Sequence, residues 1–232
     1  HDGALPAWVN KGAEFIKGDV RNKADWEKAL AGVDAVIHLA AYMDYHLDFS
    51  TYIDVNLKSL ALMYECIVEK TLPIKKIIAS SSQSVYGEGK YECREHGIQY
   101  LSGRTEEQLG KSDWEQHCPK CGKEVTPVAE LENDKLQPEI PYAISKWAGE
   151  KFLKTMGQRY NIPSVSLRYS IVLGSRQSFR HYYSGALRAF CVNVLNGGLI
   201  QMNEDGKQIR DFVHVHDVAR AHLKVLEDDR AN

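Results

Sequence analysis

Apolar runs of strand length alternate with helical stretches along most of this chain. Residues 35–41 (AVIHLAA) and 73–82 (PIKKIIASSS) are apolar runs without the in–out alternation of a half-exposed strand. Such runs are typical of parallel strands that helices cover on both faces. Apolar residues recur at helical spacing in residues 23–32, 49–70 and 141–160. The alternation predicts an α/β fold with a doubly wound parallel sheet.

The same reasoning predicts two further strands. Residues 12–20 (GAEFIKGDV) form a short apolar run before the first helix, and residues 163–174 (PSVSLRYSIVLG) follow the last long helix. Gly32 is the expected stop of the first helix. With 232 residues the chain is long enough for one large domain, with or without a small appendage.

Composition excludes several classes of protein. A net charge of −2 without a basic run argues against nucleic acid or an anionic membrane as partner. No apolar stretch reaches the ~20 residues of a membrane span, and no signal peptide opens the chain. Five cysteines is an odd number, which favours a reducing compartment over a disulfide framework. We therefore expect a cytoplasmic protein.

A polar stretch at residues 92–137 interrupts the alternation. It contains ECREHG, HCPKCG and ELENDKLQP and lies between a predicted strand and the helix that begins near Tyr142. A connection of this length inside a compact domain usually is a functional insertion or has structure of its own. We predict a core domain formed by residues 1–91 and 138–232, with residues 92–137 as an inserted module.

Cysteine spacing within this stretch predicts a zinc site. Cys93-x-x-His96 and Cys118-x-x-Cys121 form two ligand pairs, and three thiolates with one imidazole fill a tetrahedral Zn²⁺ site. His117 could replace His96. A closed set of this kind would be structural. A redox Cys-x-x-Cys and plain unligated thiols remain the alternatives.

Polar and small residues follow several predicted strands, at the edge where open parallel sheets bind ligands. Asp19 could accept a hydrogen bond from an adenine amino group, and the small Ala40 and Ala41 would let a flat ligand approach the backbone. Ser82 ends another strand and could donate to the oxygen on which Tyr142 acts. The pattern indicates a ligand site at this edge.

Tyr142 and Lys146 lie four residues apart at the start of a predicted helix. The Tyr-x-x-x-Lys spacing is common by chance, and Lys146 could be a solvated surface charge. A phenol has a pKa near ~10 and is a poor base at neutral pH. A lysine ammonium one turn away favours the phenolate, so we expect Lys146 to lower the pKa of Tyr142.

The motifs together resemble a known family. The matching stretches, which cover most of the chain, are GDVRN, VIHLAA, YIDVNLKS, SSSQSVYG, PYAISK, SLRYSIVLGSRQ and EDGKQIRDFVHVHDVARAH. They are similar to the extended short-chain dehydrogenase/reductase family, and within it to the nucleotide-sugar epimerases and dehydratases. The resemblance implies a Rossmann-like domain that binds NAD, and a substrate that is a nucleotide-diphosphate sugar.

The resemblance also implies roles for single residues. Ser82, Tyr142 and Lys146 would be catalytic, with Ser82 holding the sugar hydroxyl and Lys146 the nicotinamide ribose. Arg210 would pair with a diphosphate oxygen of the substrate, unless it is an ordinary surface ion-pair partner. The implied NAD-binding positions are Asp19, Val20, Leu39, Ala40, Ala41, Asn56, Ser80, Tyr142, Lys146 and Tyr169.

Some of these cofactor positions have competing structural explanations. Asp19 and Val20 would contact the adenine, and Tyr169 would flank the nicotinamide. Asn56 would brace the strands near the cofactor, but it could equally be a hydrogen bonder at a helix start. Val20 and Leu39 could simply belong to the core.

The expected reaction is epimerisation at C4 through a transient 4-keto sugar. Dehydratases of the family usually follow the serine position with an acid pair, whereas Gln83 and Ser84 stand here. The alternatives are a dehydratase or reductase on the same scaffold, and a non-catalytic sugar-nucleotide or NAD-binding regulator. The family often dimerises through two helices, for which residues 49–70 and 142–160 are candidates, with core packing as the competing explanation.

The chain departs from the family pattern at several points. It lacks the glycine-rich G-x-x-G-x-x-G motif, so we expect a fragment without the first βαβ unit and the C-terminal end, which would bind NAD poorly. Ser170, Ile171 and Ser175 replace residues common in the family, and Ile171 cannot make the usual asparagine contact to a diphosphate. The cysteine-bearing insert, YSGALRAF and EDGKQIRDF resemble the subgroup of dTDP-L-rhamnose 4-epimerases.

Overall fold

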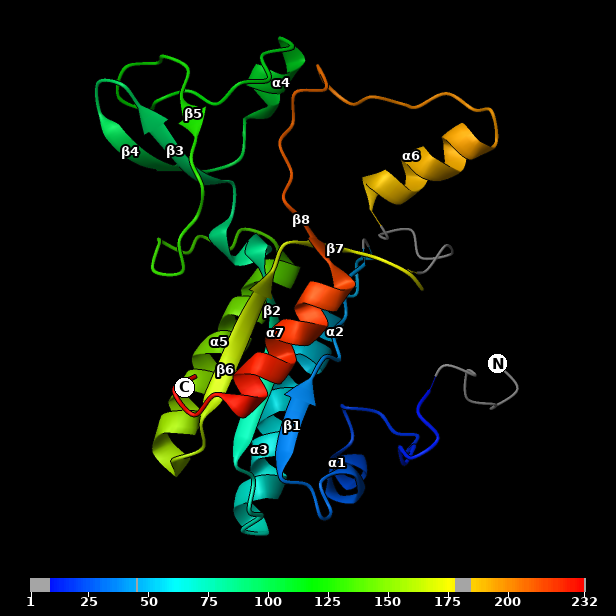
Figure 1. Cartoon of the computed structure of the whole chain (residues 1–232). Coiled ribbons are helices and arrows are strands. Elements are labelled where there is room, and N and C mark those ends of the chain that lie inside the picture. Colours follow the sequence, from blue (N-terminus) through cyan, green and yellow to red (C-terminus); the bar gives the residue numbers. More distant parts are fainter. Residues whose placement is uncertain (1–8, 45, 178–184, 232) are drawn as a thin grey trace.

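The computed structural model of the chain describes residues 9–44, 46–177 and 185–231 (Figure 1). HDGALPAW at the start, the first two residues of YSGALRAF and the last residue of the chain lie outside the described residues.

A parallel sheet forms the centre of the molecule. Its strands are β1 (Ala35–His38), β2 (Lys76–Ser82) and β6 (Ser164–Tyr169), in the order β1-β2-β6. β2 pairs in parallel with both neighbours, and the register sets Ser82 opposite Tyr169. The predicted α/β class with a doubly wound parallel sheet is confirmed. Two residues far apart in sequence thereby reach the same edge of the sheet.

Helices cover both faces of this sheet (Figure 1). α3 (Ser59–Glu69) and α5 (Pro141–Tyr160) pack on one face, and α7 (Val215–Glu227) lies across the other. Apolar side chains of α3, α5 and β2 fill the space between them. Those with no exposed surface include Met63, Ile77 and Leu153.

Local sequence explains where the helices begin and end. α1 (Lys23–Ala29) starts after Asn22, whose side chain accepts a hydrogen bond from the Ala24 amide. In α5, Pro141 occupies the first turn, where its missing N–H costs nothing, and the helix stops at Asn161 in a left-handed conformation (φ 53°). Gly32, the predicted stop of the first helix, lies just beyond the end of α1 and has a positive φ (71°).

The predicted helix at residues 49–70 is continuous but not uniform. It consists of α2 (Phe49–Ile53), a π-helical turn at Asp54–Lys58 and α3. Because a π turn inserts one extra residue, it rotates the side chains that follow it. Asn56 lies in this turn and is only 3% exposed. A Cβ at Gly149 of α5 would lie 3.2 Å from the Asn56 carbonyl, so the two helices approach closely here.

The structure corrects the predicted strands in two places. Residues 12–20 form no strand. Residues 163–174 form two short strands instead of one, β6 and β7 (Ile171–Leu173), and β7 pairs with β8 (Phe212–His214). A strand needs a neighbour to accept its hydrogen bonds, and among the described residues none lies beside 12–20.

The first strand of the sheet is also less covered than predicted. No described strand pairs with the outer edge of β1. Ile37 is 40% exposed and Leu39 57% exposed, so the prediction that helices bury this run on both faces is wrong for β1. Burial of both faces needs a helix over each face, and among the described strands of this sheet α7 packs mainly on β2.

A second, antiparallel sheet lies beyond the carboxyl ends of β2 and β6 (Figure 1). It contains β3 (Gly89–Cys93), β4 (Gly97–Leu101) and β5 (Thr126–Pro127), in the order β4-β3-β5. The short α4 (Glu106–Gly110) belongs to the same part, which we call the insert and define as residues 89–137. The domain boundaries at 92–137 stay a prediction.

The remaining described helix, α6 (Ala186–Leu195), precedes a long segment that leads to β8 and passes beside α4 (Figure 1). Among the described helices, none combines the length and the apolar character that a bilayer crossing requires.

Candidate functional site

A cavity of about 1020 Å³ opens at the carboxyl edge of the central sheet. Ser82 at the end of β2, Tyr169 at the end of β6 and Tyr142 in the first turn of α5 line it from below. The insert and the segment that carries Arg210 line its other sides. Residues predicted to act together therefore share one cavity.

Ser82 and Tyr142 both line this cavity. The Ser82 hydroxyl oxygen accepts from the Ser84 amide (3.2 Å) and hydroxyl (3.0 Å), which caps the 3₁₀ turn at Gln83–Tyr86. Burial raises the pKa of Tyr142, and a hydrogen bond with the Ser82 side chain works against that rise. Burial is the largest influence on this pKa, and the lowering expected from Lys146 together with the charge of NAD⁺ stays a prediction.

Lys146 lies one turn after Tyr142 and is 5% exposed. Its ammonium donates to the Ser80 carbonyl oxygen (2.7 Å) and to the Ser80 hydroxyl (3.1 Å). Burial lowers the pKa of Lys146 to about 8, while the Glu150 carboxylate one turn later raises it. The amine is thus not a solvated surface charge. Since an ammonium has three donors, it can still donate to a ligand beside Ser80.

Asn56 connects three parts of the site. Its side chain accepts from the Tyr42 amide (2.7 Å) and donates to the Tyr42 carbonyl (3.0 Å), in the loop after β1. It also donates to the Ser145 hydroxyl (2.9 Å), which in turn donates to the Tyr142 carbonyl (2.7 Å). This geometry fits a bracing role for Asn56, and Ser145 is a partner that the sequence did not single out.

Tyr169 is held by a contact to the opposite face of the sheet. Its hydroxyl lies 2.6 Å from Nε2 of His222 in α7, whose Nδ1 lies 2.8 Å from the Val218 carbonyl. Because a carbonyl only accepts, Nδ1 carries the proton and Tyr169 donates to Nε2. Burial raises the pKa of Tyr169 to about 12. The ring position at the cavity is therefore fixed by α7.

A buried ion pair behind the cavity was not expected from the sequence. Arg168 of β6 donates to both carboxylate oxygens of Glu150 (2.9 Å each), to the Tyr86 hydroxyl (2.9 Å) and to the Glu132 carbonyl (2.9 Å). Glu150 also accepts from Ser81. The network joins β2, α5 and β6 just behind Ser82. The only indication of this network in the sequence was a charged residue in each of two elements predicted to be mostly buried, Glu150 in α5 and Arg168 in β6.

The other predicted cofactor residues lie in different settings. Both Asp19 carboxylate oxygens accept from the Arg21 guanidinium (2.6–3.1 Å), which holds the pKa of Asp19 at about 2. Val20 packs against the core, as its competing explanation suggested. Leu39, Ala40 and Ala41 follow β1 and are partly or largely exposed.

Arg210 lines the cavity, but its guanidinium donates to the neighbouring Ile209 carbonyl (2.7 Å). Ile171, which replaces the family's usual asparagine, lines the same cavity. No described acidic side chain pairs with Arg210. The competing explanation of Arg210 as an ion-pair partner thus has no support in the described residues.

A buried histidine under the site was also not expected. His38 ends β1, is 5% exposed and stacks on Trp26 with ring centroids 5.5 Å apart. Its Nε2 lies 3.0 Å from the Ser59 hydroxyl, which donates to the Val55 carbonyl (2.6 Å). Burial and the nearby Lys146 charge lower the pKa of His38 to about 4.

The structure brings the four predicted metal ligands together in the insert. Their ligand atoms lie within 4.8 Å of one another. Nδ1 of His96 is 3.6 Å from the sulfurs of both Cys93 and Cys118, and the Cys93 and Cys121 sulfurs are 3.7 Å apart. A tetrahedral zinc site with Zn–S of ~2.3 Å and Zn–N of ~2.0 Å has edges of about 3.6–3.8 Å. His117 instead pairs with Asp113 (2.9 Å).

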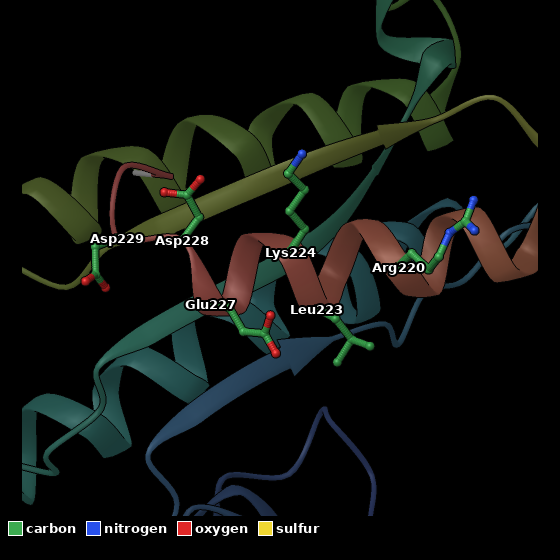
Figure 2. Close-up of a pocket in the computed structure, with 6 residues that line it drawn as sticks. All are labelled: Arg220, Leu223, Lys224, Glu227, Asp228 and Asp229. Carbon is green, nitrogen blue, oxygen red and sulfur yellow. The ribbon is translucent and has the colours of Figure 1, made fainter.

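A second pocket, of about 770 Å³, lies along α7 (Figure 2). It is lined by Arg220, Leu223, Lys224, Glu227, Asp228 and Asp229. In Figure 2, Lys224 and Asp228 lie on one side of the ribbon and Leu223 and Glu227 on the other, and none of the lining residues is a predicted site residue. The cavity at Tyr142 is therefore the candidate site.

Comparison with known proteins agrees with this geometry. The model of the NAD dependent epimerase/dehydratase family matches residues 3–232. The chain is 27% identical to the dTDP-L-rhamnose 4-epimerase of Burkholderia thailandensis, over 95% of this chain and 61% of that protein. The chain thus spans about 60% of the length of such relatives.

Solved structures give the same result. A UDP-glucuronic acid 4-epimerase from Bacillus cereus, in complex with UDP-glucuronic acid and NAD, superposes with a TM-score of 0.70 at 26% identity, covering 96% of this chain and 58% of that one. The Thermus thermophilus UDP-glucose 4-epimerase in complex with NAD reaches 0.66 at 28% identity, covering 95% and 62%.

Proposed function

The chain belongs to the NAD-dependent epimerase/dehydratase family, and from that premise we propose that it carries the catalytic centre of a nucleotide-sugar 4-epimerase. The substrate would be a nucleotide-diphosphate sugar, inverted at C4 through a transient 4-keto sugar. The observation that carries this proposal is the shared cavity of Ser82, Tyr142 and Tyr169, with Lys146 anchored one turn behind.

NAD fits this site at its nicotinamide end. Lys146 presents an ammonium with a spare donor beside Ser80, and Tyr169 offers an aromatic ring at the cavity. Asp19, Val20, Leu39, Ala40, Ala41 and Asn56 would complete the cofactor contacts, provided Asp19 shares its carboxylate with Arg21. When bound, NAD accepts the hydride from C4 and returns it to the sugar.

Ser82, Tyr142 and Lys146 would then carry out the proton transfer from the sugar 4-hydroxyl. Ser82 would hold the 4-hydroxyl oxygen, and the Tyr142 phenolate would take its proton. A phenolate at neutral pH needs the pKa of Tyr142 lowered by ~3 units, or about 4 kcal/mol of differential interaction. Since burial alone raises this pKa, the deprotonated form depends on positive charge, which Lys146 supplies in part. Lys146, with a pKa of about 8, is mostly protonated at pH 7.

Substitution of the phenol tests the proposal. In the full-length protein, Tyr142→Phe should reduce C4 epimerisation by about two to four orders of magnitude, the usual range for a lost acid–base group. Tyr160→Phe is the matched control, because Tyr160 lies on the same helix but at its far, exposed end. Near-normal turnover of Tyr142→Phe would exclude the role.

The product mixture separates the proposal from its alternatives. An epimerase interconverts the two C4 epimers without net NADH. A stable keto product would identify a dehydratase, net NADH a dehydrogenase or reductase, and tight nucleotide-sugar binding without turnover a regulator. The absence of an acid pair after Ser82, where Gln83 and Ser84 stand, favours the epimerase.

We propose in addition that the insert binds one structural Zn²⁺ through Cys93, His96, Cys118 and Cys121. The support is the match between the observed 3.6 and 3.7 Å separations and the edges of a tetrahedral site. The cysteine sulfurs are free thiols and far beyond the ~2.05 Å of a disulfide. A closed set of protein ligands leaves no position for a substrate.

A homodimer in the cytoplasm is the expected setting. Phe49, Ile53 and Ile144 on α2 and α5 are 43–54% exposed, and α2 packs against α5, so the helices of residues 49–70 and 142–160 present a joint apolar surface. Sedimentation should give twice the monomer mass for the wild type and the monomer mass for Ile53→Glu. A monomeric wild type would contradict the dimer.

A further inference from the structure

The insert and the segment that carries Arg210 lie on the same side of the cavity, although about 100 residues separate them. Arg104 and Trp114 of the insert line the cavity together with Glu204 and Arg210. In Figure 1 the segment leading to β8 passes beside α4. The insert and the segment that carries Arg210 therefore line the cavity together, and tertiary contacts have to hold them side by side.

One ion pair makes this connection. Arg104 donates through Nη1 to Oε2 of Glu204 (3.0 Å) and through Nη2 to Oε1 (2.9 Å), a bidentate geometry. The same guanidinium donates to the Trp114 carbonyl (2.8 Å), which fixes it to the insert. Both side chains are only about a fifth exposed. Such a pair specifies an orientation that a single contact would leave free.

The backbone of Glu204 has a left-handed conformation. Its φ of 52° is in the left-handed region, which is unfavourable for a residue with a side chain. Nearby, Lys207 reaches Glu115 of the insert only at 4.0 Å and through largely exposed side chains. Among the described contacts, the Arg104–Glu204 bridge is thus the closest ion pair that holds this segment against the insert.

We propose that Arg104 and Glu204 are positioning residues. Their ion pair fixes where Arg210 lies relative to the cavity, and through this contact the insert determines how tightly the substrate binds. This inference rests on the proposed function, because it concerns the substrate of the Tyr142 site. Glu204 precedes Arg210 by six residues, and no described ion pair holds Arg210 itself. A segment that is already ordered loses less conformational entropy when it binds a ligand, so it binds more tightly. The Arg104–Glu204 ion pair orders the segment that carries Arg210.

Steady-state kinetics on the full-length protein test the proposal. Arg104→Met and Glu204→Gln should each raise the KM for the nucleotide sugar about tenfold and leave kcat within about twofold, because the bridge serves binding and not the chemical step. The double variant should be no worse than either single one, since each change already removes the whole interaction. Arg104→Glu combined with Glu204→Arg should recover part of the loss.

Lys111→Met is the matched control. It removes an ion pair of the same kind in the same insert, between Lys111 and Glu107 (2.7 Å), but this pair is exposed and lies outside the cavity. Its KM should equal that of the wild type. An unchanged KM in Arg104→Met and Glu204→Gln, or an equal rise in Lys111→Met, overturns the proposal. Should Arg104→Met disturb the insert, Glu204→Gln decides, because it changes no residue of the insert.

Hydrogen exchange provides a readout that needs no activity. In both bridge variants the amides of residues 203–211 should exchange at least about tenfold faster, while those of β2 keep their wild-type rates. Unchanged exchange rates at residues 203–211 would contradict the proposal that the Arg104–Glu204 ion pair orders this segment. Faster exchange in a protein whose wild type neither binds nor converts nucleotide sugars supports the bridge and contradicts the proposed function, so the two failures are distinguishable.

Discussion

The central sheet and the insert are stabilised by different kinds of contact. The sheet and its helices bury twelve apolar side chains in one cluster. The insert buries four, and two of these, Cys93 and Cys118, are proposed metal ligands. One part of the chain therefore packs around an apolar cluster, whereas the other brings together one histidine and three cysteine side chains within 4.8 Å of one another.

Simple magnitudes support this contrast. Full burial of one large apolar side chain contributes about 1.5–3 kcal/mol. Leu101 and Val125, the buried aliphatic residues of the insert cluster, thus contribute only a few kcal/mol. The apolar core of the insert is therefore small, and its dependence on a bound metal is part of the zinc proposal.

Metal removal should have the largest effect. Purified protein should contain about one Zn²⁺ per chain, and a chelator or Cys118→Ala should abolish amide protection in β3 and β4 because the metal replaces a core there. Amides of β2 should keep their protection. The measurement is metal analysis together with hydrogen exchange.

The control is Cys66→Ala, which removes a buried cysteine of the central core that is not near the proposed site. It should leave the zinc content unchanged. Less than about half an equivalent of zinc in careful preparations, or a fully protected insert without metal, would contradict the dependence on metal.

A substitution in the apolar core of the sheet should affect the sheet alone and leave the insert unchanged. Leu153→Ala removes a side chain with no exposed surface from the core, which should lower the free energy of unfolding of the sheet by about 3 kcal/mol. Zinc content should not change. Leu223→Ala on α7, where the side chain is 55% exposed, is the matched control and should be close to neutral. A parallel loss of zinc in Leu153→Ala would show that the two regions are not independent.

Acid should produce the smallest effect, through His38. Its folded-state pKa of about 4 lies below the ordinary 6.5, so the fold favours the neutral ring. The stability that this contributes is complete above pH 6.5 and is lost as the pH falls toward 4. At pH 5 the loss should be about 2 kcal/mol, from ~1.5 units at 1.36 kcal/mol each.

Exchange of β2 amides measures this loss in the sheet separately from the insert, whose ligands also take up protons in acid. His38→Gln should flatten the dependence between pH 6.5 and 5, and His216→Gln, an exposed histidine, should not. If the His38→Gln variant keeps the wild-type pH dependence of β2 exchange, the loss of stability in acid comes from another group.

Local chemistry made much of the fold predictable. Pro141 and the apolar spacing of residues 141–160 are sufficient to predict α5, and the serine run after PIKKII is sufficient to place the end of β2. The clustering of Cys93, His96, Cys118 and Cys121 was predictable because Cys-x-x-Cys and Cys-x-x-His spacing lets each pair face one point. The prediction of a strand at residues 12–20 was wrong, because an apolar run becomes a strand only beside another strand.

Contacts between distant residues could not be predicted in the same way. Arg104 and Glu204, or Glu150 and Arg168, are charged residues that any surface could carry, and nothing near them in sequence indicates a partner. The surroundings of Tyr142 are a further case. Spacing placed Lys146 one turn away, but only the tertiary packing shows that burial raises the pKa of Tyr142, and the lowering expected from Lys146 together with the charge of NAD⁺ stays a prediction.

The amino-acid sequence by itself determined the class of fold, the paired cysteine and histidine spacing of the insert and the types of side chain at the site, because periodicity, spacing and functional groups are local properties. The tertiary structure decided which of those side chains share a cavity, which charges are paired, and that the insert reaches over the substrate edge of the sheet. Those outcomes depend on desolvation and on distances between residues far apart in the chain, and neither quantity exists until the chain is folded.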